Sequence, residues 1–220
     1  MDQGGTAQYV YNALNQRAQA TVNGVATGYL FNATEQRVSE WNGTTQLQGK
    51  YEWGACPVAY YAHGVTHFEH QDWLGTERMR TSYNGTVEGT FASLPFGDGQ
   101  ATTGVDTDAN HYAQLDQDVE SWTAHAQARQ YSNLQGRWLS PDPYHGSYKW
   151  RNPQSFNRYA YVGNNPLAAT DPLGQEDCPD FNLDNGEVCY GAEMSGDGGS
   201  STGLVACAAG NHGSDCQRDE

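Results

Sequence analysis

A sequence unit near the N-terminus recurs after 20 residues, and this spacing restricts the possible folds more than any other feature. Tyr-Val-Tyr-Asn at 9–12, followed by Arg17, returns as Tyr-Leu-Phe-Asn at 29–32, followed by Arg37. Large and polar side chains alternate within each unit, which is the period of a β-strand. A short, fixed period of this kind predicts an array of small β-units.

An Asn-Gly pair follows each unit, at 23–24 and at 42–43. Asn-Gly tolerates the positive φ angles that both central positions of a tight hairpin turn require. Each unit is therefore predicted to be a strand, a turn and a returning strand. One hairpin cannot bury its apolar face alone, so the units should stack. Two clear copies are too few for a stable array, and we expect further copies upstream.

The rest of the chain is predicted to be mainly β as well. Only 37% of the residues are hydrophobic, while aromatic residues make up 12%, which suits strands rich in Tyr, Phe, Trp, Val and Thr. We predict strands at 60–61, 67–80 and 87–91, a hairpin at 84–85 and a turn at 95–99 that ends the sheet. Residues 100–120 are predicted to be a polar loop, and 122–131 a short helix or a strand.

Three parts of the chain follow from these patterns. Residues 1–100 are predicted to form a strip of antiparallel hairpins. Residues 101–174 are predicted to form a compact, loop-rich plug, because turn-forming residues recur every few positions. Residues 175–220 are rich in Gly, Ser, Asp and Cys and are predicted to be a variable, flexible tail.

Charge and hydropathy exclude some classes of partner. The formal charge is −15, from 26 acidic and 11 basic residues, so a nucleic-acid backbone would repel the chain. No apolar run approaches the ~20 residues of a membrane-spanning helix. The first residues lack the basic-then-apolar pattern of a signal peptide, so an export signal would have to lie upstream.

The cysteines and histidines give weaker signals. Four cysteines crowd the tail, at Cys178, Cys189, Cys207 and Cys216. They fit either two disulfides, which would indicate an oxidising compartment, or free thiols in a disordered tail. His63, His67 and His70 fit solvated strand residues better than a metal site. The acidic run from Asp106 departs from a calcium loop, and we expect no cofactor.

Several motifs in order resemble RHS proteins and their YD repeats. The 20-residue units are similar to YD repeats, with Asn12 and Asn32 where those repeats usually carry Asp. The other similar segments, in chain order, are 70–78, 84–85, 95–97, 128–143, 152–159, 164–166 and the closing Asp-Pro-Leu-Gly at 171–174. Together they cover about residues 6–174, and the ordered set is far more specific than any single piece.

The resemblance implies a fold and a role. RHS proteins wind β-hairpins into a hollow shell, and their associated core plugs one end. The shell encloses a variable C-terminal segment, often a toxin. The expected partners are therefore the remainder of its own shell and the C-terminal cargo, and the expected location is secreted or cell-surface. Residues 175–220 hold the cargo position, but 46 residues with few large apolar side chains are small for an enzyme.

The resemblance also implies a chemistry. In some RHS proteins the core cuts the chain just after the closing motif, in the manner of an aspartic protease. Carried over, the catalytic pair is Asp142 and Asp171, the cleavage motif is Asp171, Pro172, Leu173, Gly174 and Gln175, and the cut bond would be Gln175–Glu176. The alternative is that both aspartates are turn residues that accept backbone N–H groups. Gln175, where cutting members carry an apolar residue, favours that alternative, as does Pro141, where they often carry arginine.

Three functions stay open from the sequence. The first is a structural end of a shell, the second a single-turnover autoprotease, and the third a surface adhesion or carbohydrate-binding module that uses exposed aromatic rings. The sheet edges of an isolated strip should be open, so we also expect self-association.

Overall fold

The computed structural model describes residues 6–33, 36–53, 56–105, 108, 110–143 and 150–175. The described part is almost entirely antiparallel β-structure in two sheets, which confirms the mainly-β prediction. The four tail cysteines, from Cys178 to Cys216, lie outside the described residues, as does Asp106. No helix among the described residues is long and apolar enough to cross a membrane.

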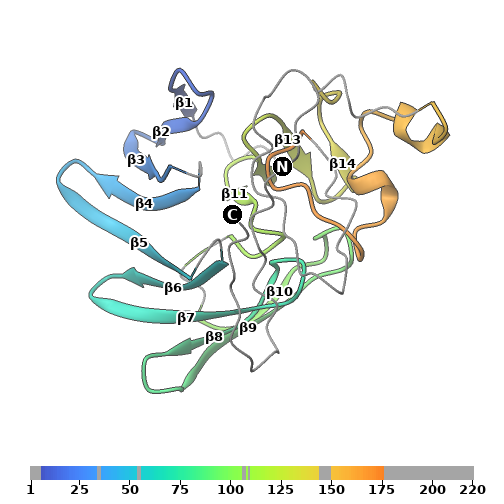
Figure 1. Ribbon diagram of the computed structural model, residues 1–220. Helices are drawn as coiled ribbons and strands as arrows, with labels where there is room; N and C mark the ends of the chain where they lie inside the picture. The colour runs from blue at the N-terminus through green and yellow to red at the C-terminus, as the bar shows by residue number, and fades with distance from the viewer. Residues whose placement is uncertain are drawn as a thin grey trace, which may run out of the picture.

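The larger sheet is an up-and-down meander of ten strands in sequence order. Figure 1 shows that it curves around the later part of the chain. Its strands are β1 (Ala7–Tyr11), β2 (Arg17–Val22), β3 (Val25–Phe31), β4 (Arg37–Asn42), β5 (Thr45–Trp53), β6 (Cys56–Ala62), β7 (Val65–Gln71), β8 (Glu77–Ser82), β9 (Val87–Ala92) and β10 (Ala101–Gly104).

The repeat continues further in the structure than its sequence signature indicates. Two-residue turns join strands at 23–24, 43–44 and 63–64, and a longer turn at 83–86 follows, so the period holds through four hairpins. The third turn is His63-Gly64, with φ of 51° and 84°. The prediction that His63 is a strand residue is therefore wrong. Histidine stands where the first turn has Asn23, and this hid the third copy. The second turn is Gly43-Thr44, one residue later than the predicted Asn42-Gly43, because Asn42 still pairs with Thr45.

A wider turn alternates with each tight one, and its first residue explains the Asn-for-Asp exchange. The Oδ1 atoms of Asn12 and Asn32 accept the backbone N–H groups of Gln16 and Gln36, each at 2.9 Å. Asp72 accepts the N–H of Thr76 at 3.0 Å in the same way. An amide or a carboxylate oxygen serves equally as this acceptor. The turn at Asp72 also splits the predicted strand 67–80 into β7 and β8, so that prediction is wrong.

The predicted turn at 95–99 is present, but it does not end the sheet. Gly97 and Gly99 have φ of 80° and 59°. The chain then returns as β10, which pairs with β9. The sheet therefore ends one strand later than predicted, and part of the predicted loop 100–120 is strand.

The described residues of the segment 111–175, called the plug here, carry a small sheet and the main apolar core. Its elements are β11 (Asp116–Asp118), β12 (Thr123–His125), β13 (Gln130–Ser132), β14 (Arg137–Trp138), and the 3₁₀ helices η1 (Pro153–Phe156) and η2 (Val162–Asn164). Residues 122–131 thus contain β12 and the start of β13, which resolves the helix-or-strand alternative in favour of strand. Strand β11 lies in the region predicted to be a loop.

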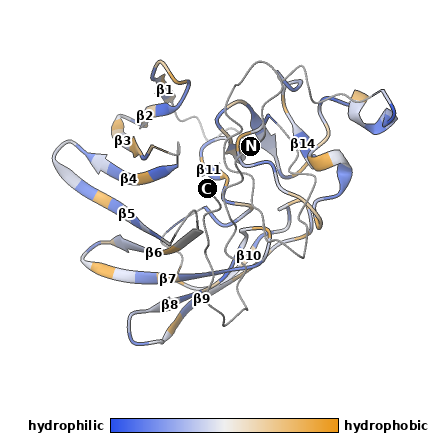
Figure 2. Ribbon diagram, in the orientation of Figure 1, coloured by the Kyte–Doolittle hydropathy of each residue, from blue (hydrophilic) through white to orange (hydrophobic). Residues whose placement is uncertain are grey.

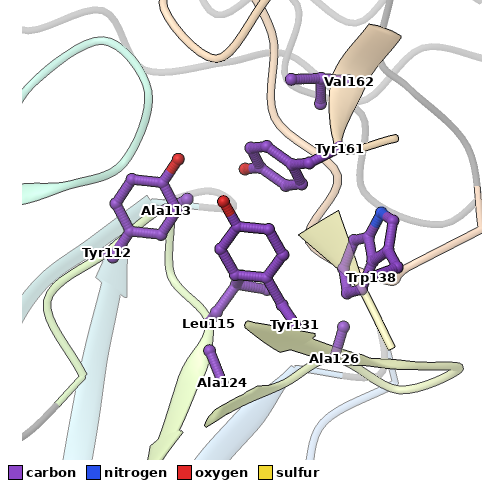
Figure 3. Packing of buried hydrophobic residues seen from close by; sticks show 9 residues of the cluster. All are labelled: Tyr112, Ala113, Leu115, Ala124, Ala126, Tyr131, Trp138, Tyr161 and Val162. Carbon is purple, nitrogen blue, oxygen red and sulfur yellow. The ribbon is translucent and has the colours of Figure 1, made fainter. Parts of the chain in front are cut away.

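Aromatic rings fill the plug core (Figure 3). Tyr131 and Tyr161 are fully buried, with ring centroids 4.6 Å apart, and Trp138 packs 5.4 Å from Tyr131. The hydroxyl of Tyr131 donates to the backbone oxygen of Phe96, and that of Tyr112 to the oxygen of Pro95, both at 2.9 Å. These bonds fasten the core to the turn after β9. Figure 2 shows hydrophobic and hydrophilic residues mixed along the strands of the larger sheet. The hydrophobic cluster is formed by plug residues, whereas the sheet buries single side chains such as Tyr60 and Phe91.

Candidate functional site

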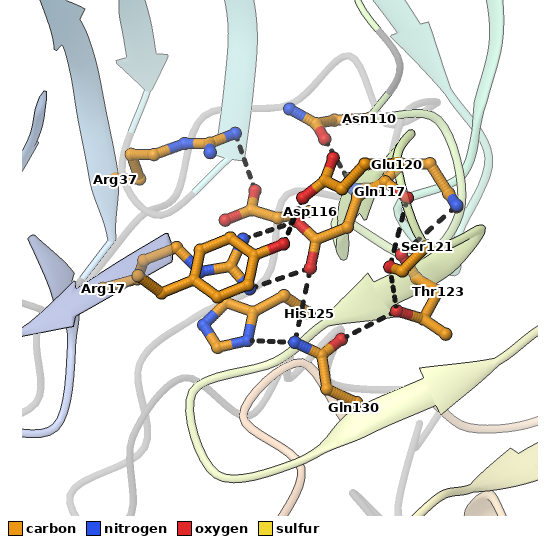
Figure 4. Close-up of polar contacts among 12 residues, drawn as sticks. Arg17, Arg37, Asn110, Asp116, Gln117, Glu120, Ser121, Thr123, His125 and Gln130 are labelled. Carbon is orange, nitrogen blue, oxygen red and sulfur yellow. Dashed lines mark hydrogen bonds and ion pairs between the residues drawn. The ribbon is translucent and has the colours of Figure 1, made fainter. Parts of the chain in front are cut away.

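The first part of the site is the contact between the concave face of the larger sheet and the plug. The guanidinium of Arg17 lies over the ring of Tyr9 at 4.2 Å, and that of Arg37 lies over Tyr29 at 5.0 Å. Each arginine also reaches an aspartate of β11. Arg17 binds Asp118 through both terminal nitrogens, with Nη2 2.8 Å from Oδ2 (Figure 4).

The second rung of this contact repeats the first. Arg37 Nη2 lies 2.7 Å from Asp116 Oδ1. A step of 20 residues along the repeat thus corresponds to a step of two residues along β11. Two inter-strand spacings are about 9.5 Å and two residues of strand about 6.7 Å, and long arginine side chains take up this difference. The arginines of successive repeats therefore lie in a row opposite the acidic residues of β11, and each arginine forms an ion pair with one of them.

A third arginine extends the network to the far end of the sheet. Glu77 accepts hydrogen bonds from Arg80 Nε and Nη2 at 2.9 and 2.6 Å. The same carboxylate contacts Nδ1 of His111 in the plug at 2.7 Å. Arg80 lies between Tyr60 and Phe91, 5.0 and 4.9 Å from their ring centroids.

Burial makes these charges interdependent. Arg17 and Asp118 are both buried. Burial acts to lower the pKa of Arg17, but the hydrogen bonds and charge of Asp118 outweigh it and raise that pKa. A buried ion pair adds little net stability compared with an apolar pair, but loss of one partner leaves an uncompensated charge. The rungs are thus better suited to fixing how the plug sits than to adding stability.

A cavity of about 120 Å³ lies between the concave face and the plug. Arg17, Arg37 and Glu69 line it from the sheet, His125 from β12, and Leu173 from the closing motif. Burial, followed by the charge of Arg17, lowers the pKa of His125 from 6.5 to about 4. Gln130 Nε2 lies 3.1 Å from His125 Nδ1, where it donates to the neutral ring. Burial raises the pKa of Glu69 from 4.5 to about 7.

These shifts predict how stability depends on pH. Between pH 6.5 and 4, His125 binds a proton in the unfolded chain but stays neutral in the folded chain. The contribution of His125 to the free energy of unfolding is therefore fully present above pH 6.5 and is lost as the pH falls towards 4. Glu69 acts oppositely, because its contribution is present below pH 4.5 and lost as the pH rises through 7.

We therefore expect His125→Asn, which keeps an acceptor for Gln130, to remove about 2 kcal/mol of acid destabilisation between pH 7.5 and 4.5. Urea unfolding of the parent and the variant at both pH values measures this difference. An equal pH dependence in the two proteins would contradict the assignment to His125. His63→Asn, in an exposed turn, is the control.

The second part of the site joins the two predicted aspartates through an arginine. Arg129 Nη2 lies 3.0 Å from Asp171 Oδ2 and 3.3 Å from Asp142 Oδ2. All three residues are buried, with Asp171 only 1% exposed. Arg129 lies 4.4 Å over the ring of Trp138, and its Nη1 donates to the backbone oxygen of Arg158 at 3.1 Å. One guanidinium therefore links four segments of the plug.

The closing motif is held from both sides in this cluster. Arg129 Nε donates to the carbonyl oxygen of Gly174 at 2.5 Å. Asp171 Oδ1 accepts the N–H groups of Gly174 at 2.8 Å and Gln175 at 3.1 Å. Gly174 has φ of 72°, and a Cβ there would lie 3.1 Å from Ala126 Cβ, so the last position of the motif requires glycine.

This arrangement has two chemical readings. The hydrogen bonds of Asp171 to two successive N–H groups are those of a side chain that stabilises a turn. The two carboxylates around one buried group also have the composition that shared-proton chemistry requires. In the geometry described, one nitrogen of Arg129 contacts an oxygen of each carboxylate.

The sequence indicated the two aspartates but not their partner. Arg129 lies within the segment 128–143 that carries the family resemblance, yet nothing in its spacing links it to Asp142 and Asp171. Asp116 and Asp118 were missed because 100–120 was taken as a polar loop. The sequence signal that could have indicated this contact is the combination of two acidic residues at alternate positions, Asp116 and Asp118, with an arginine that recurs in each repeat. Among the described residues no group of three or more His, Cys, Asp or Glu could hold a metal ion.

Comparisons with known proteins agree with this architecture. No family model matches the chain. Over 174 residues it is 28% identical to the tRNA3(Ser)-specific nuclease WapA of Bacillus spizizenii, which covers 76% of this chain and 7% of that protein. It superposes on a chain of the TcdB2-TccC3-Cdc42 crystal structure with a TM-score of 0.59 and 20% identity, covering 80% of this chain and 9% of that one.

A second solved structure, the Photorhabdus luminescens Tc holotoxin pore, gives a TM-score of 0.56 and 18% identity over 83% of this chain and 9% of the other. The fold is RHS-like. The similarities support a loose relation to RHS-type, toxin-related proteins. The chain spans less than a tenth of the length of each of these proteins.

Proposed function

We propose that this chain is the closing end of an RHS-type β-shell, which encloses and presents a variable C-terminal segment outside the cytoplasm. The observation that carries the proposal is the docking of the plug on the concave face through Arg17–Asp118 and Arg37–Asp116. A sheet that curves around its own plug, with the contacts repeated at the period of the sequence, is what a closed end requires.

The position of the closing motif supports the same role. Pro172 and Leu173 line the cavity on the concave side, and Ala128 N donates to the oxygen of Leu173 at 2.9 Å. The chain after Gly174 therefore starts beside the interior surface of the sheet. The proposed partners are further strands of the same shell and the segment 175–220 as cargo.

Thiol labelling tests whether the cargo segment starts inside. In a reduced chain whose other four cysteines are serine, we expect Cys178 to react with a 5-kDa polyethylene-glycol maleimide at least about tenfold more slowly than in denaturant, because protection scales with the fraction of time the site is open. A matched chain that retains only Cys216 reports on a site 38 residues further along. Equal rates for Cys178 in the native and denatured chains would contradict enclosure.

The second candidate function is a single-turnover autoprotease. The observation that favours it is the approach of Asp142 and Asp171 to one buried nitrogen, beside the backbone of the closing motif. The peptide lies within the site, so hydrolysis would be intramolecular and gain from high effective concentration. Water would add to a backbone carbonyl, and the proton taken from it would pass to the departing amide nitrogen.

Intact mass decides between a cutting pair and a structural pair. If the pair cuts, the freshly purified chain loses its last ~45 residues, while Asp142→Asn and Asp171→Asn stay whole, because each removes one member of the carboxylate pair. Full-length mass in all three proteins would leave the aspartates as turn-holding residues. The third interpretation, a surface adhesion or carbohydrate-binding module, stays a prediction. Tyr9, Tyr29 and Tyr60 lie against arginines, whereas the rings of Trp73, Tyr83, Trp122 and Trp150 are exposed.

A further inference from the structure

The acidic row that meets the arginines has one member more than the row of cations. Asp116, Asp118 and Glu120 follow one another at every second residue. Asp116 is paired with Arg37 and Asp118 with Arg17. Glu120 instead accepts a hydrogen bond from the hydroxyl of Tyr9 on β1 (Figure 4). That bond joins a carboxylate to a neutral group, so no described residue gives the third acid of the row the charge complement that the other two have.

Glu120 also contacts β1, the strand at the edge of the larger sheet. Asp116 pairs with Arg37 of β4, Asp118 pairs with Arg17 of β2, and Glu120 contacts β1. From Asp116 to Glu120, the contacts of the acidic row therefore shift across the sheet towards β1, the strand that ends it. The next position in this progression, two strands beyond β2, is the free side of β1.

The edge of β1 is open to a further strand. Among the described residues β1 pairs only with β2. Its side chains are mostly exposed, Val10 to 54% and Tyr11 to 43%. An unpaired strand edge presents a row of N–H and C=O groups that a strand from another segment can bind.

We propose that the free edge of β1 binds the second strand of a further hairpin of the same repeat type, and that the arginine of this hairpin forms an ion pair with Glu120. This inference rests on the proposed shell-end function and extends it. It specifies which strand continues the shell, and it identifies Glu120 as the plug residue that fixes the register of that strand. Arg17 and Arg37 are each the first residue of the second strand of their hairpins. The partner arginine is therefore expected at the first residue of the added strand, one 20-residue repeat before Arg17.

A chain with one added repeat tests the proposal. The full chain is extended by a second copy of residues 6–25, placed directly before Thr6. The probe is thus a hairpin of known sequence at high effective concentration. We expect amide hydrogens of β1 that point away from β2 to become protected from exchange, and the midpoint of thermal unfolding to rise by about 4 °C.

Charge variants then separate the ion pair from simple strand addition. Glu120→Gln, or glutamine in place of the arginine of the added copy, should each remove about half of the gain or more, and both together no more than either alone. Additive losses, a gain that ignores both changes, or β1 amides that stay unprotected would each overturn the proposal. Pairing of β1 with a second copy of the chain would appear in light scattering as association that is independent of Glu120, which would also overturn it.

The parent chain with Glu120→Gln provides the control for folding. Glu120 is only partly buried, and it receives a single hydrogen bond from Tyr9, so this variant should unfold within about 2 °C of the parent. Labelling of Cys178 does not involve the added repeat. If the ion pair of Glu120 with the added arginine does not form, only the added-repeat experiment fails. If the shell-end function is wrong, the labelling of Cys178 shows it separately.

Discussion

Arg129→Met is expected to lower the free energy of unfolding by about 3–5 kcal/mol, the cost of leaving buried carboxylates without their cation. Asp142 and Asp171 would both face an apolar side chain of similar length, and the carbonyl of Gly174 would lose its donor. Urea unfolding followed by tryptophan fluorescence measures the loss, since Trp138 lies against Arg129.

Arg137→Met is the matched control for this prediction. Arg137 is exposed, and its side chain makes one weak hydrogen bond, to the oxygen of Gln135 at 3.4 Å. Its replacement should change stability by less than about 0.5 kcal/mol. A loss below about 1 kcal/mol for Arg129→Met would show that the cluster does not hold the plug together. Arg129→Lys should recover only part of the stability, because an ammonium cannot reproduce the planar fork of donors.

Arg17→Met is expected to cost about 3–5 kcal/mol at the contact between sheet and plug, because Asp118 would stay buried and unpaired. The double variant with Asp118→Leu should recover much of this loss, since an apolar pair replaces an ion pair of similar volume. Chemical unfolding of the single and double variants gives the coupling between the two residues.

The Arg78–Asp72 pair, whose arginine is partly exposed, is the matched control for Arg17. Its nitrogen–oxygen distance is 2.8 Å, equal to that between Arg17 Nη2 and Asp118 Oδ2, but the side chain of Arg78 is 41% exposed. Arg78→Met should therefore cost no more than about 1 kcal/mol. Equal losses for Arg17→Met and Arg78→Met would mean that the rung is not a buried constraint, and would weaken the case for a plug positioned by the repeat.

The sequence predicted the hairpins best where local chemistry decides the backbone. Asn23-Gly24 and the turn around Asn84-Gly85 lie where they were predicted, because positive φ angles are a local requirement. His63-Gly64 takes the same conformation with a less typical residue, and its tight turn was therefore missed. The split of 67–80 at Asp72 was missed for a similar reason, because a carboxylate that binds two N–H groups forms a turn inside an apparent strand.

The candidate site was predictable only in part. The family resemblance indicated Asp142 and Asp171, and the structure brings both to Arg129. The acids of β11 lie about 80 to 100 residues from the arginines they meet, and no local pattern reports such a contact. Whether Asp142 and Asp171 cut the chain stays a prediction, as do the boundaries of the three parts and the role of the cysteine-containing tail.

By itself, the sequence determined the β-period, the 20-residue repeat and most of the tight turns, because these depend on residues within a few positions of one another. Only the tertiary structure decided that the sheet curves around its plug, that Arg17 and Arg37 meet successive acids of β11, and that Arg129 joins the two aspartates. These features depend on which segments, distant in sequence, share one buried space. In a buried site a charged side chain is stable only next to an opposite charge. Which residues form such pairs is therefore determined only when the whole chain folds.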